Sequence, residues 1–192
     1  MTQQITNVLL VGVGGQGILL ASEILSEAAM LAGFDVKKSE IHGMSQRGGS
    51  VVSHVRYGRE VFSPIVPEGE GDILFGFELM ETCRSLPLIK RGGTVVANDL
   101  RISPPSVLMG QETYPAGLVE RIRGLFPDFL LVDGQEIARD AGNVRAANTV
   151  LLGAVSRRLE IAEEYWMMAL EKMVPPKALE VNNKAFLIGR EL

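Results

Sequence analysis

The chain has 192 residues, 46% of them hydrophobic and 22% charged, a balance that is ordinary for a globular protein and sufficient to bury a core. Its formal net charge of −4 provides no basic field for nucleic acid, and apolar runs such as Val8 to Val13 are too short to span a bilayer. Because Met1-Thr2-Gln3-Gln4 also lacks the pattern of a signal peptide, we expect one cytoplasmic domain over residues 1–192, with neither a membrane nor a nucleic acid as partner.

The first predicted elements form a β-α-β unit. A continuous apolar run predicts a buried strand over residues 5–13, and an apolar stripe at helical spacing predicts a helix over residues 18–32. Gly33 is well placed to end that helix in a left-handed turn, after which residues 34–41 predict a second strand. Strands joined through a helix in this way are expected to form a parallel pair with a right-handed crossover.

The middle of the chain alternates between strand and helix patterns. Alternating side chains predict a strand over residues 51–57, followed by a turn and a short hairpin partner at Val61-Phe62. The pattern then predicts a surface loop at 63–71, a strand at 72–77, a helix at 79–90 and a strand at 94–98.

The last part of the chain is mostly helical. Residues 101–117 are rich in proline and irregular, with a short strand expected at 106–109, and residues 129–132 predict a last buried strand. Three helices are expected at 146–159, 162–173 and 177–190. The whole pattern predicts an α/β fold: a Rossmann-like, mostly parallel sheet flanked by helices, with a helical C-terminal third.

The cysteine and histidine content limits the metal chemistry of the chain. Cys83 is the only cysteine, so the chain can form no internal disulfide and cannot ligate an iron–sulfur cluster by itself. His42 and His54 have no metal-ligand spacing with each other or with Cys83. Any metal or iron–sulfur chemistry is therefore expected on another polypeptide, and Cys83 is expected to be a buried, inert thiol.

A first glycine-rich loop, Gly12-Val13-Gly14-Gly15-Gln16-Gly17, lies between the first strand and the first helix. Its glycine spacing matches the dinucleotide fingerprint, in which backbone amides approach a phosphate at a helix N-terminus. The acidic residue that should hold a ribose is poorly placed, since Asp35 begins the second strand and Glu40 leads into another glycine loop. Binding of NAD(P) or FAD, binding of another phosphate, and a purely structural turn all remain open.

A second loop follows the second strand as Glu40-Ile41-His42-Gly43-Met44-Ser45-Gln46-Arg47-Gly48-Gly49-Ser50. Its glycines bracket three polar side chains, of which the Arg47 guanidinium suits a carboxylate or phosphate. The alternative is a structural loop in which Arg47 pairs with Glu40 or another carboxylate. Because the two loops follow successive strands, we expect them to lie side by side at one edge of the sheet, where open α/β sheets bind ligands.

Together these two loops resemble the gamma-type subunits of 2-oxoacid:ferredoxin oxidoreductases, and within that family the indolepyruvate type. The Ser45-Gln46-Arg47-Gly48-Gly49 segment is the most specific part of the resemblance. It continues in the run from Asn148 to Ala154 and in Asn183-Lys184-Ala185-Phe186 with Gly189, and so extends over nearly the whole chain.

The resemblance implies a division of labour between subunits. The family decarboxylates a 2-oxoacid on thiamine diphosphate, passes two electrons through iron–sulfur clusters to ferredoxin, and releases an acyl-CoA. In the indolepyruvate type, a large alpha subunit is expected to carry the thiamine diphosphate and the clusters. This chain would bind no cofactor alone, reach ferredoxin only through the complex, and show little activity by itself; a homodimer is an allowed state of the isolated chain.

The resemblance also implies a role for the two loops. They would face the partner's cofactor or the co-substrate coenzyme A and position its anionic groups, with no catalytic residue and no metal ligand on this chain. The residues expected to do so are Gly12, Gly14, Gly15, Gln16, Gly17, Ser45, Gln46, Arg47 and Gly48.

Two other functions remain as alternatives. The first is an independent Rossmann-type oxidoreductase that binds NAD(P), which the missing strand-end acid disfavours. The second is a non-catalytic assembly module, in which the glycine loops only shape a docking surface. Asn148 and Asn183 are expected to hydrogen-bond across a helix-packing interface in each case, and His54 to be a structural residue.

Overall fold

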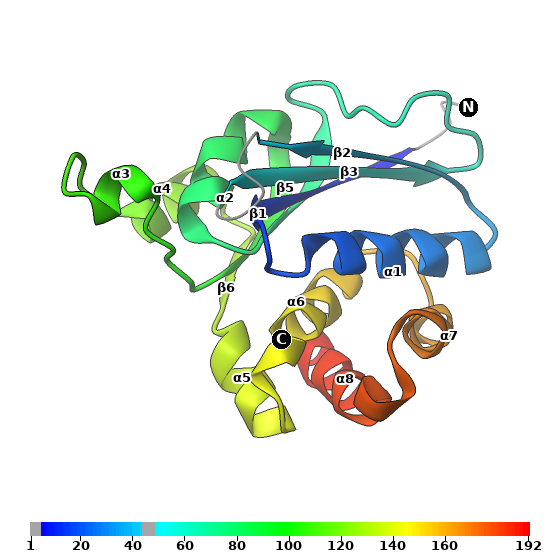
Figure 1. Ribbon diagram of the computed structural model, residues 1–192. Helices are drawn as coiled ribbons and strands as arrows, with labels where there is room; N and C mark the ends of the chain where they lie inside the picture. The colour runs from blue at the N-terminus through cyan, green and yellow to red at the C-terminus, as the bar shows by residue number, and fades with distance from the viewer. Residues whose placement is uncertain (1–4, 44–48) are drawn as a thin grey trace.

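The computed structural model describes residues 5–43 and 49–192 and shows one six-stranded sheet with helices on both faces (Figure 1). The order of the strands in the sheet is β2-β3-β1-β4-β5-β6. Their bounds are β1 (Thr6–Val13), β2 (Asp35–His42), β3 (Ser50–Gly58), β4 (Gly71–Gly76), β5 (Ile89–Asn98) and β6 (Phe129–Val132).

The sheet is mixed, with one strand running against the others. Parallel ladders join β1 to β4, β4 to β5 and β5 to β6, whereas β3 is antiparallel to both of its neighbours, β1 and β2. All strands except β3 therefore run in one direction. The expected α/β class, with a mostly parallel sheet and a helical C-terminal third, is confirmed.

The expected parallel pairing of β1 with β2 is wrong, because β3 lies between them. Most of β3 is buried, as an interior strand must be, whereas every residue of β2 is at least partly exposed and several are charged, as suits an edge. The hairpin partner of β3 is thus β2, and the predicted partner at Val61-Phe62 is not a strand.

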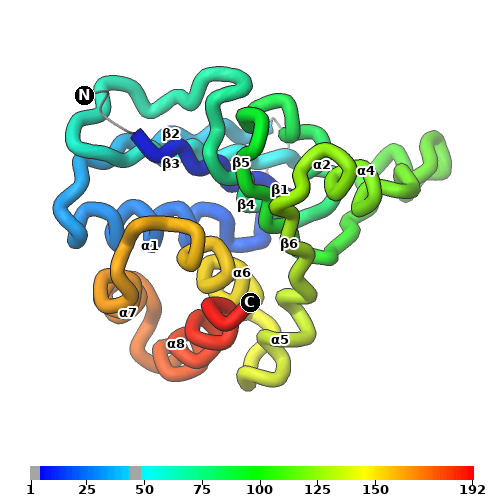
Figure 2. Tube along the Cα trace, turned by 180° about the vertical axis from the view of Figure 1, so that it is seen from behind, coloured from blue at the N-terminus to red at the C-terminus, as the bar shows by residue number. Residues whose placement is uncertain are grey.

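The helices divide between the two faces of the sheet (Figures 1 and 2). One face carries α1 (Ile18–Leu31), behind which α6 (Ala147–Ser156), α7 (Glu163–Met173) and α8 (Pro176–Arg190) pack together, with α5 (Gly134–Ala141) beside them. The other face carries α2 (Leu79–Ser85) and α4 (Leu118–Leu125). The remaining elements are short: α3 (Pro105–Leu108), η1 (Leu86–Leu88) and η2 (Val144–Ala146). None of the helices in the described part of the chain has the length and hydropathy that a membrane span requires.

Each face of the sheet has its own apolar core. Val8 and Leu10 of β1 contribute to the core under α1, whereas Leu9 and Val11 contribute to the core under α2 and α4. This division explains why β1 is an unbroken apolar run, since both of its faces are covered. The larger core also contains Trp166, which is fully buried. The centroids of the Trp166 and Phe186 rings are 5.7 Å apart.

Three local predictions need correction. The helix expected over 79–90 stops at Ser85, and β5 then begins at Ile89, five residues before the expected start of that strand at residue 94. The strand expected at 106–109 is instead the short helix α3, which begins at a proline, a residue favoured in a first helical turn. Helix α4 was not predicted, because its short amphipathic pattern directly follows the irregular segment.

Two glycines allow α6 and α8 to approach until their backbones touch. A Cβ added to Gly153 would overlap the carbonyl oxygen of Phe186, and one added to Gly189 would overlap the carbonyl oxygen of Val150. No side chain can move aside to relieve either overlap, because the atoms in contact are backbone atoms. The helix pair that backs α1 therefore depends on the absence of a methyl group at both positions.

We expect Gly153→Ala to lower the free energy of unfolding by about 1–3 kcal/mol, the usual cost of overpacking, because α6 and α8 must separate. Urea unfolding of the purified chain would measure this. The matched control is Gly124→Ala in α4, where an added Cβ meets nothing within 4 Å. There the better helix propensity of alanine should leave stability unchanged or raise it by up to about 1 kcal/mol. Equal stability of the two variants would contradict the close packing.

His54 lies buried in β3 under the segment that follows this strand. Its Nδ1 accepts a hydrogen bond from the backbone N–H of Val66 at 3.1 Å. Burial, and to a smaller degree the positive charge of Arg56, lowers the pKa of His54 below its ordinary value of 6.5. The folded state therefore holds a neutral imidazole where the unfolded chain would take up a proton.

We expect this difference to make His54 a source of acid sensitivity. Below about pH 6.5 the unfolded state binds a proton that the folded state rejects, so the contribution of His54 to stability falls as the pH falls toward its folded pKa. The variant His54→Gln should be less stable than the parent at pH 7, and the difference should narrow toward pH 5. Chemical unfolding at a series of pH values measures both, and a difference independent of pH would contradict the assignment.

Candidate functional site

The carboxyl ends of the parallel strands meet at one edge of the sheet, where the loops after β1, β4, β5 and β6 come together. The chain leaves β1 toward α1 on one face and leaves β4 toward α2 on the other. The crevice between two strands that diverge in this way is the usual ligand-binding position of an open α/β sheet. The first glycine loop lies at this crevice.

The backbone of this loop requires several of its glycines. Gly15 and Gly17 have φ angles of 98° and 81°, in the left-handed region that other residues rarely adopt. A Cβ on Gly12 would lie 2.6 Å from Oε1 of Gln16 and 2.8 Å from Cβ of Phe77. Close packing therefore accounts for Gly12, and the left-handed backbone accounts for Gly15 and Gly17, while a binding role for these glycines remains a prediction.

Gln16 joins the end of β1 to the end of β4. Its Oε1 accepts a hydrogen bond from the N–H of Val13 at 2.6 Å, and its Nε2 donates to the carbonyl of Phe77 at 2.9 Å. Both ends of the amide are thus engaged inside the fold. The contribution of Gln16 to a binding site, in this geometry, is to fix the shape of the glycine loop.

The flanks of the second loop lie directly beside the first. Gly14 N–H donates to the carbonyl of Gly49 at 2.9 Å, and Gly43 N–H donates to the carbonyl of Ser50 at the same distance. The expected proximity of the two loops is therefore confirmed for the described flanks. Four residues predicted to contact a ligand lie outside the described residues: Ser45, Gln46, Arg47 and Gly48.

The N-terminus of α1 opens toward this pair of loops. No side chain caps it, and its first turn contains no acidic residue. Its exposed amide dipoles are therefore favourable for an anion. A cleft of about 690 Å³ lies against it, and its walls are Gly14, Gly15, Gly17, Ile18, Leu19, Leu20, His42, Gly43 and Val51. The cleft combines backbone polar groups with an apolar wall.

A smaller and more polar cavity of about 400 Å³ lies on the other side of the glycine loop. Asn98 lines this cavity and is fixed by two hydrogen bonds. Its Oδ1 accepts from Gly134 N–H at 3.0 Å, and its Nδ2 donates to the Phe77 carbonyl at 3.3 Å. Asn148 of α6 lies so close that a Cβ on Gly17 would meet its Nδ2 at 2.7 Å. Asn148 thus packs against the glycine loop, whereas the hydrogen bond between α6 and α8 comes from its neighbour Thr149, whose hydroxyl donates to Oδ1 of Asn182 at 2.6 Å.

Sequence reasoning missed the residues that give this cavity its polarity. Asn98 is the last residue of β5, and Gln135 lies in the first turn of α5, shortly after β6. Both are therefore close to the ends of predicted strands, at the edge where ligands bind, and this position was the available signal. Arg145 also lines the cavity, from the short helix η2, and no strand pattern pointed to it.

Glu78, immediately after Phe77, was also missed and is fully buried. Its Oε2 accepts from the N–H of Glu81 at 2.8 Å and so caps α2. Its Oε1 accepts from the N–H of Ile102 at 3.2 Å and from the hydroxyl of Tyr114. Burial raises the pKa of Tyr114, and the hydrogen bond to Glu78 raises it further, so Tyr114 stays protonated and donates. Glu78 thereby fastens the irregular segment after β5 to the sheet.

The acidic residues of β2 are not placed to hold a ribose beside the first loop. Glu40 accepts a hydrogen bond from Lys38 at 2.9 Å, and its other oxygen lies 3.7 Å from Nε2 of His42. Because β3 intervenes, β2 lies two strand spacings, about 10 Å, from β1. In residues 5–43 and 49–192, no group of three or more His, Cys, Asp or Glu side chains could hold a metal ion. The two glycine loops and the uncapped N-terminus of α1 are instead suited to binding and orienting an anionic group.

Comparison with known proteins gives one consistent family. Residues 7–192 match the family described as pyruvate ferredoxin/flavodoxin oxidoreductase. The chain is 42% identical over 190 residues to the indolepyruvate oxidoreductase subunit IorB of Pyrococcus horikoshii, covering 95% of this chain and 93% of that protein.

Two solved structures share the fold. The gamma subunit of keto/oxoacid ferredoxin oxidoreductase from Geobacter sulfurreducens matches with a TM-score of 0.71 and 25% identity, over 98% of this chain and 95% of that one. The 2-oxoglutarate:ferredoxin oxidoreductase from Magnetococcus marinus, with 2-oxoglutarate, coenzyme A and succinyl-CoA bound, matches with a TM-score of 0.73 and 20% identity, over 98% of this chain but 31% of that one. The chain therefore belongs to the pyruvate ferredoxin/flavodoxin oxidoreductase family, as a relative of its small, gamma-type subunits.

Proposed function

We propose that this chain is the small subunit of a thiamine diphosphate- and ferredoxin-dependent oxidoreductase that converts an arylpyruvate, such as indolepyruvate, and coenzyme A into an arylacetyl-CoA and CO₂. The observation that carries the proposal is the 42% identity, over nearly the full length of both chains, to a subunit named for indolepyruvate. The likeness to the Geobacter gamma subunit supports the same type of subunit.

The decarboxylation on thiamine diphosphate and the electron transfer through iron–sulfur clusters would take place on a large alpha subunit. An iron–sulfur cluster of the common type needs four thiolates, and this sequence contains only Cys83. The residues present therefore do not fit a cluster, and electrons would reach ferredoxin through the partner.

The two glycine loops would hold an anionic part of coenzyme A or of the partner's cofactor. The uncapped first turn of α1 offers backbone donors, and the cleft beside it is bounded by Gly14 and Gly43, one from each loop. Arg47, between Gly43 and Gly49, would add a guanidinium with two parallel donors. These groups would bind and orient the substrate while the partner supplies the reacting centre.

The NAD(P) alternative gains no support from the geometry. A dinucleotide site needs an acid at the end of the strand adjacent to the glycine loop. Here the adjacent strand is the antiparallel β3, and Glu40 of β2 is already paired with Lys38. In the leading proposal Arg47 would position a ligand, whereas in the assembly module it would serve complex formation. A substitution of Arg47 separates these two roles.

We expect the isolated chain to show no oxidation of indolepyruvate, and the complex with its large subunit to be active. Anaerobic co-expression of the two chains, followed by a coenzyme A-dependent assay of ferredoxin or viologen reduction, measures this. The partner should contain thiamine diphosphate and iron–sulfur clusters by mass spectrometry and absorbance. A chain that purifies alone from its host, with no such partner, would overturn the proposal.

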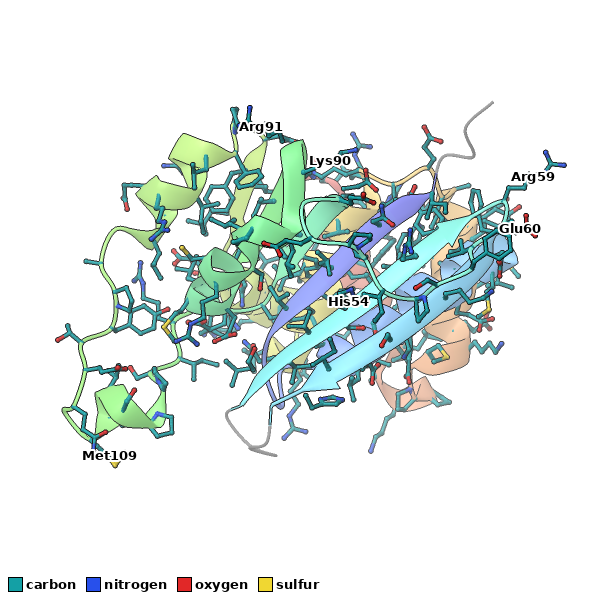
Figure 3. The ribbon with its side chains drawn as sticks, turned by 90° about the horizontal axis from the view of Figure 1, so that it is seen from above. His54, Arg59, Glu60, Lys90, Arg91 and Met109 are labelled. Atoms are coloured by element: carbon teal, nitrogen blue, oxygen red, sulfur yellow. The ribbon has the colours of Figure 1, made fainter. Side chains whose placement is uncertain are left out.

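For Arg47→Ala we expect an intact complex whose KM for coenzyme A is raised about 10-fold or more, since a charge-assisted hydrogen bond contributes about 1.5–3 kcal/mol. Size-exclusion chromatography reports assembly, and steady-state kinetics report KM. The control is Arg59→Ala, at the opposite end of β3 from the loop (Figure 3), which should change neither. Loss of the complex in Arg47→Ala would favour the assembly module instead.

A further inference from the structure

A second surface lies away from the glycine loops, in a groove between α2 and α4 on the face of the sheet opposite α1. The groove has a volume of about 840 Å³. Its floor and walls are largely apolar, with Met80, Leu86, Ile89, Leu118, Leu125 and Phe126 among the lining residues. Leu125, at the edge of the groove, is 59% exposed. The other five of these residues are buried and form the apolar base of the groove, so Leu125 is the exposed large apolar side chain among them.

Three arginines, Arg84, Arg91 and Arg121, line the same groove from α2, β5 and α4. Arg84 lies 2.6 Å from the carboxylate of Glu81, but neither Arg91 nor Arg121 forms an ion pair with any residue in the described part of the chain. Figure 3 shows Arg91 projecting outward from its end of β5. On a chain whose net charge is −4, this local excess of positive charge favours an acidic occupant.

The shape of the groove favours a polypeptide over a small molecule. A pocket for a small ligand encloses most of the surface of that ligand. Here Arg84, Arg91, Arg121 and Leu125 are all exposed, so a small molecule would remain largely in water. Two helices with an apolar strip between them are instead the usual receptor for a third, amphipathic helix.

We propose that this groove receives an amphipathic helix of the large partner subunit, with an apolar stripe against Leu118 and Leu125 and acidic residues beside Arg91 and Arg121. This rests on the proposed function, because it names the surface through which the small subunit holds its partner. The pairing would cover the exposed Leu125 and the apolar base of the groove, and it would neutralise the two arginines that form no ion pair within the described residues.

Cys83 provides a native reporter for this proposal. It lines the groove and is partly exposed, so the prediction of a buried thiol is wrong, and it is the only cysteine in the sequence. The rate of its alkylation by iodoacetamide can therefore be followed by mass spectrometry of its peptide, in the isolated chain and in the purified complex. We expect alkylation to be at least 10-fold slower in the complex.

The possible outcomes are distinct. A complex that assembles and is active, but in which Cys83 reacts at the free rate, would overturn the groove as the interface and leave the proposed function standing. Failure of the two chains to form any complex would overturn both. Protection of Cys83 in the isolated chain by added arylacetyl-CoA, with no further protection by the partner, would identify a small-molecule site and overturn the helix.

Charge reversal tests the chemistry of the occupant. The double variant Arg91→Glu/Arg121→Glu should raise the Kd for the large subunit at least 10-fold, and the parent's Kd should rise with salt more steeply than the variant's. Both side chains are exposed, so thermal unfolding of the isolated variant should match the parent. Arg59→Glu, an exposed reversal elsewhere on the chain, is the control and should leave the Kd unchanged. An unchanged Kd in the double variant would exclude an acidic partner segment.

Discussion

The position of β3 between β1 and β2 determines how the rest of the binding edge is built. Its two antiparallel ladders begin where the second glycine loop ends, with Ser50 opposite Val13 and Val51 opposite His42. Both loops are thereby brought to one edge, and the Gly14 amide reaches the Gly49 carbonyl. The same insertion moves β2 away from β1 and removes the acid that a dinucleotide would need. One strand therefore both assembles this site and separates it from the Rossmann sites that its glycine spacing resembles.

The elements that could be predicted from sequence are those whose patterns are local. The apolar run of β1, the stripe of α1 and the turn at Gly33, whose φ is 90°, follow from residue types over a few positions. The order of strands could not be predicted in the same way, because a β-α-β pattern normally gives a parallel pair. The choice of β3 as the interior strand depends on burial of both of its faces, which is a property of the whole sheet.

The candidate site shows the same limit. Glycine spacing located the loop, but not the fact that Gln16 is hydrogen-bonded at both ends to the backbone. Asn98, Glu78 and Arg145 come from segments far apart in the sequence, and only the fold brings them near the loop. The resemblance to a family of multi-subunit enzymes was the most informative feature, because it pointed to chemistry that these residues could not supply alone.

The hydrogen bonds of Gln16 and Glu78 connect the two surfaces to one short segment of the chain. The amide of Gln16 donates a hydrogen bond to the carbonyl of Phe77. The next residue, Glu78, caps α2, which forms one wall of the groove between α2 and α4. The glycine loop and α2 are thus attached to two consecutive residues that directly follow β4. No other residue separates the two points of attachment. The cleft and the groove, on different sides of the sheet, therefore share one short segment of the chain as a common support.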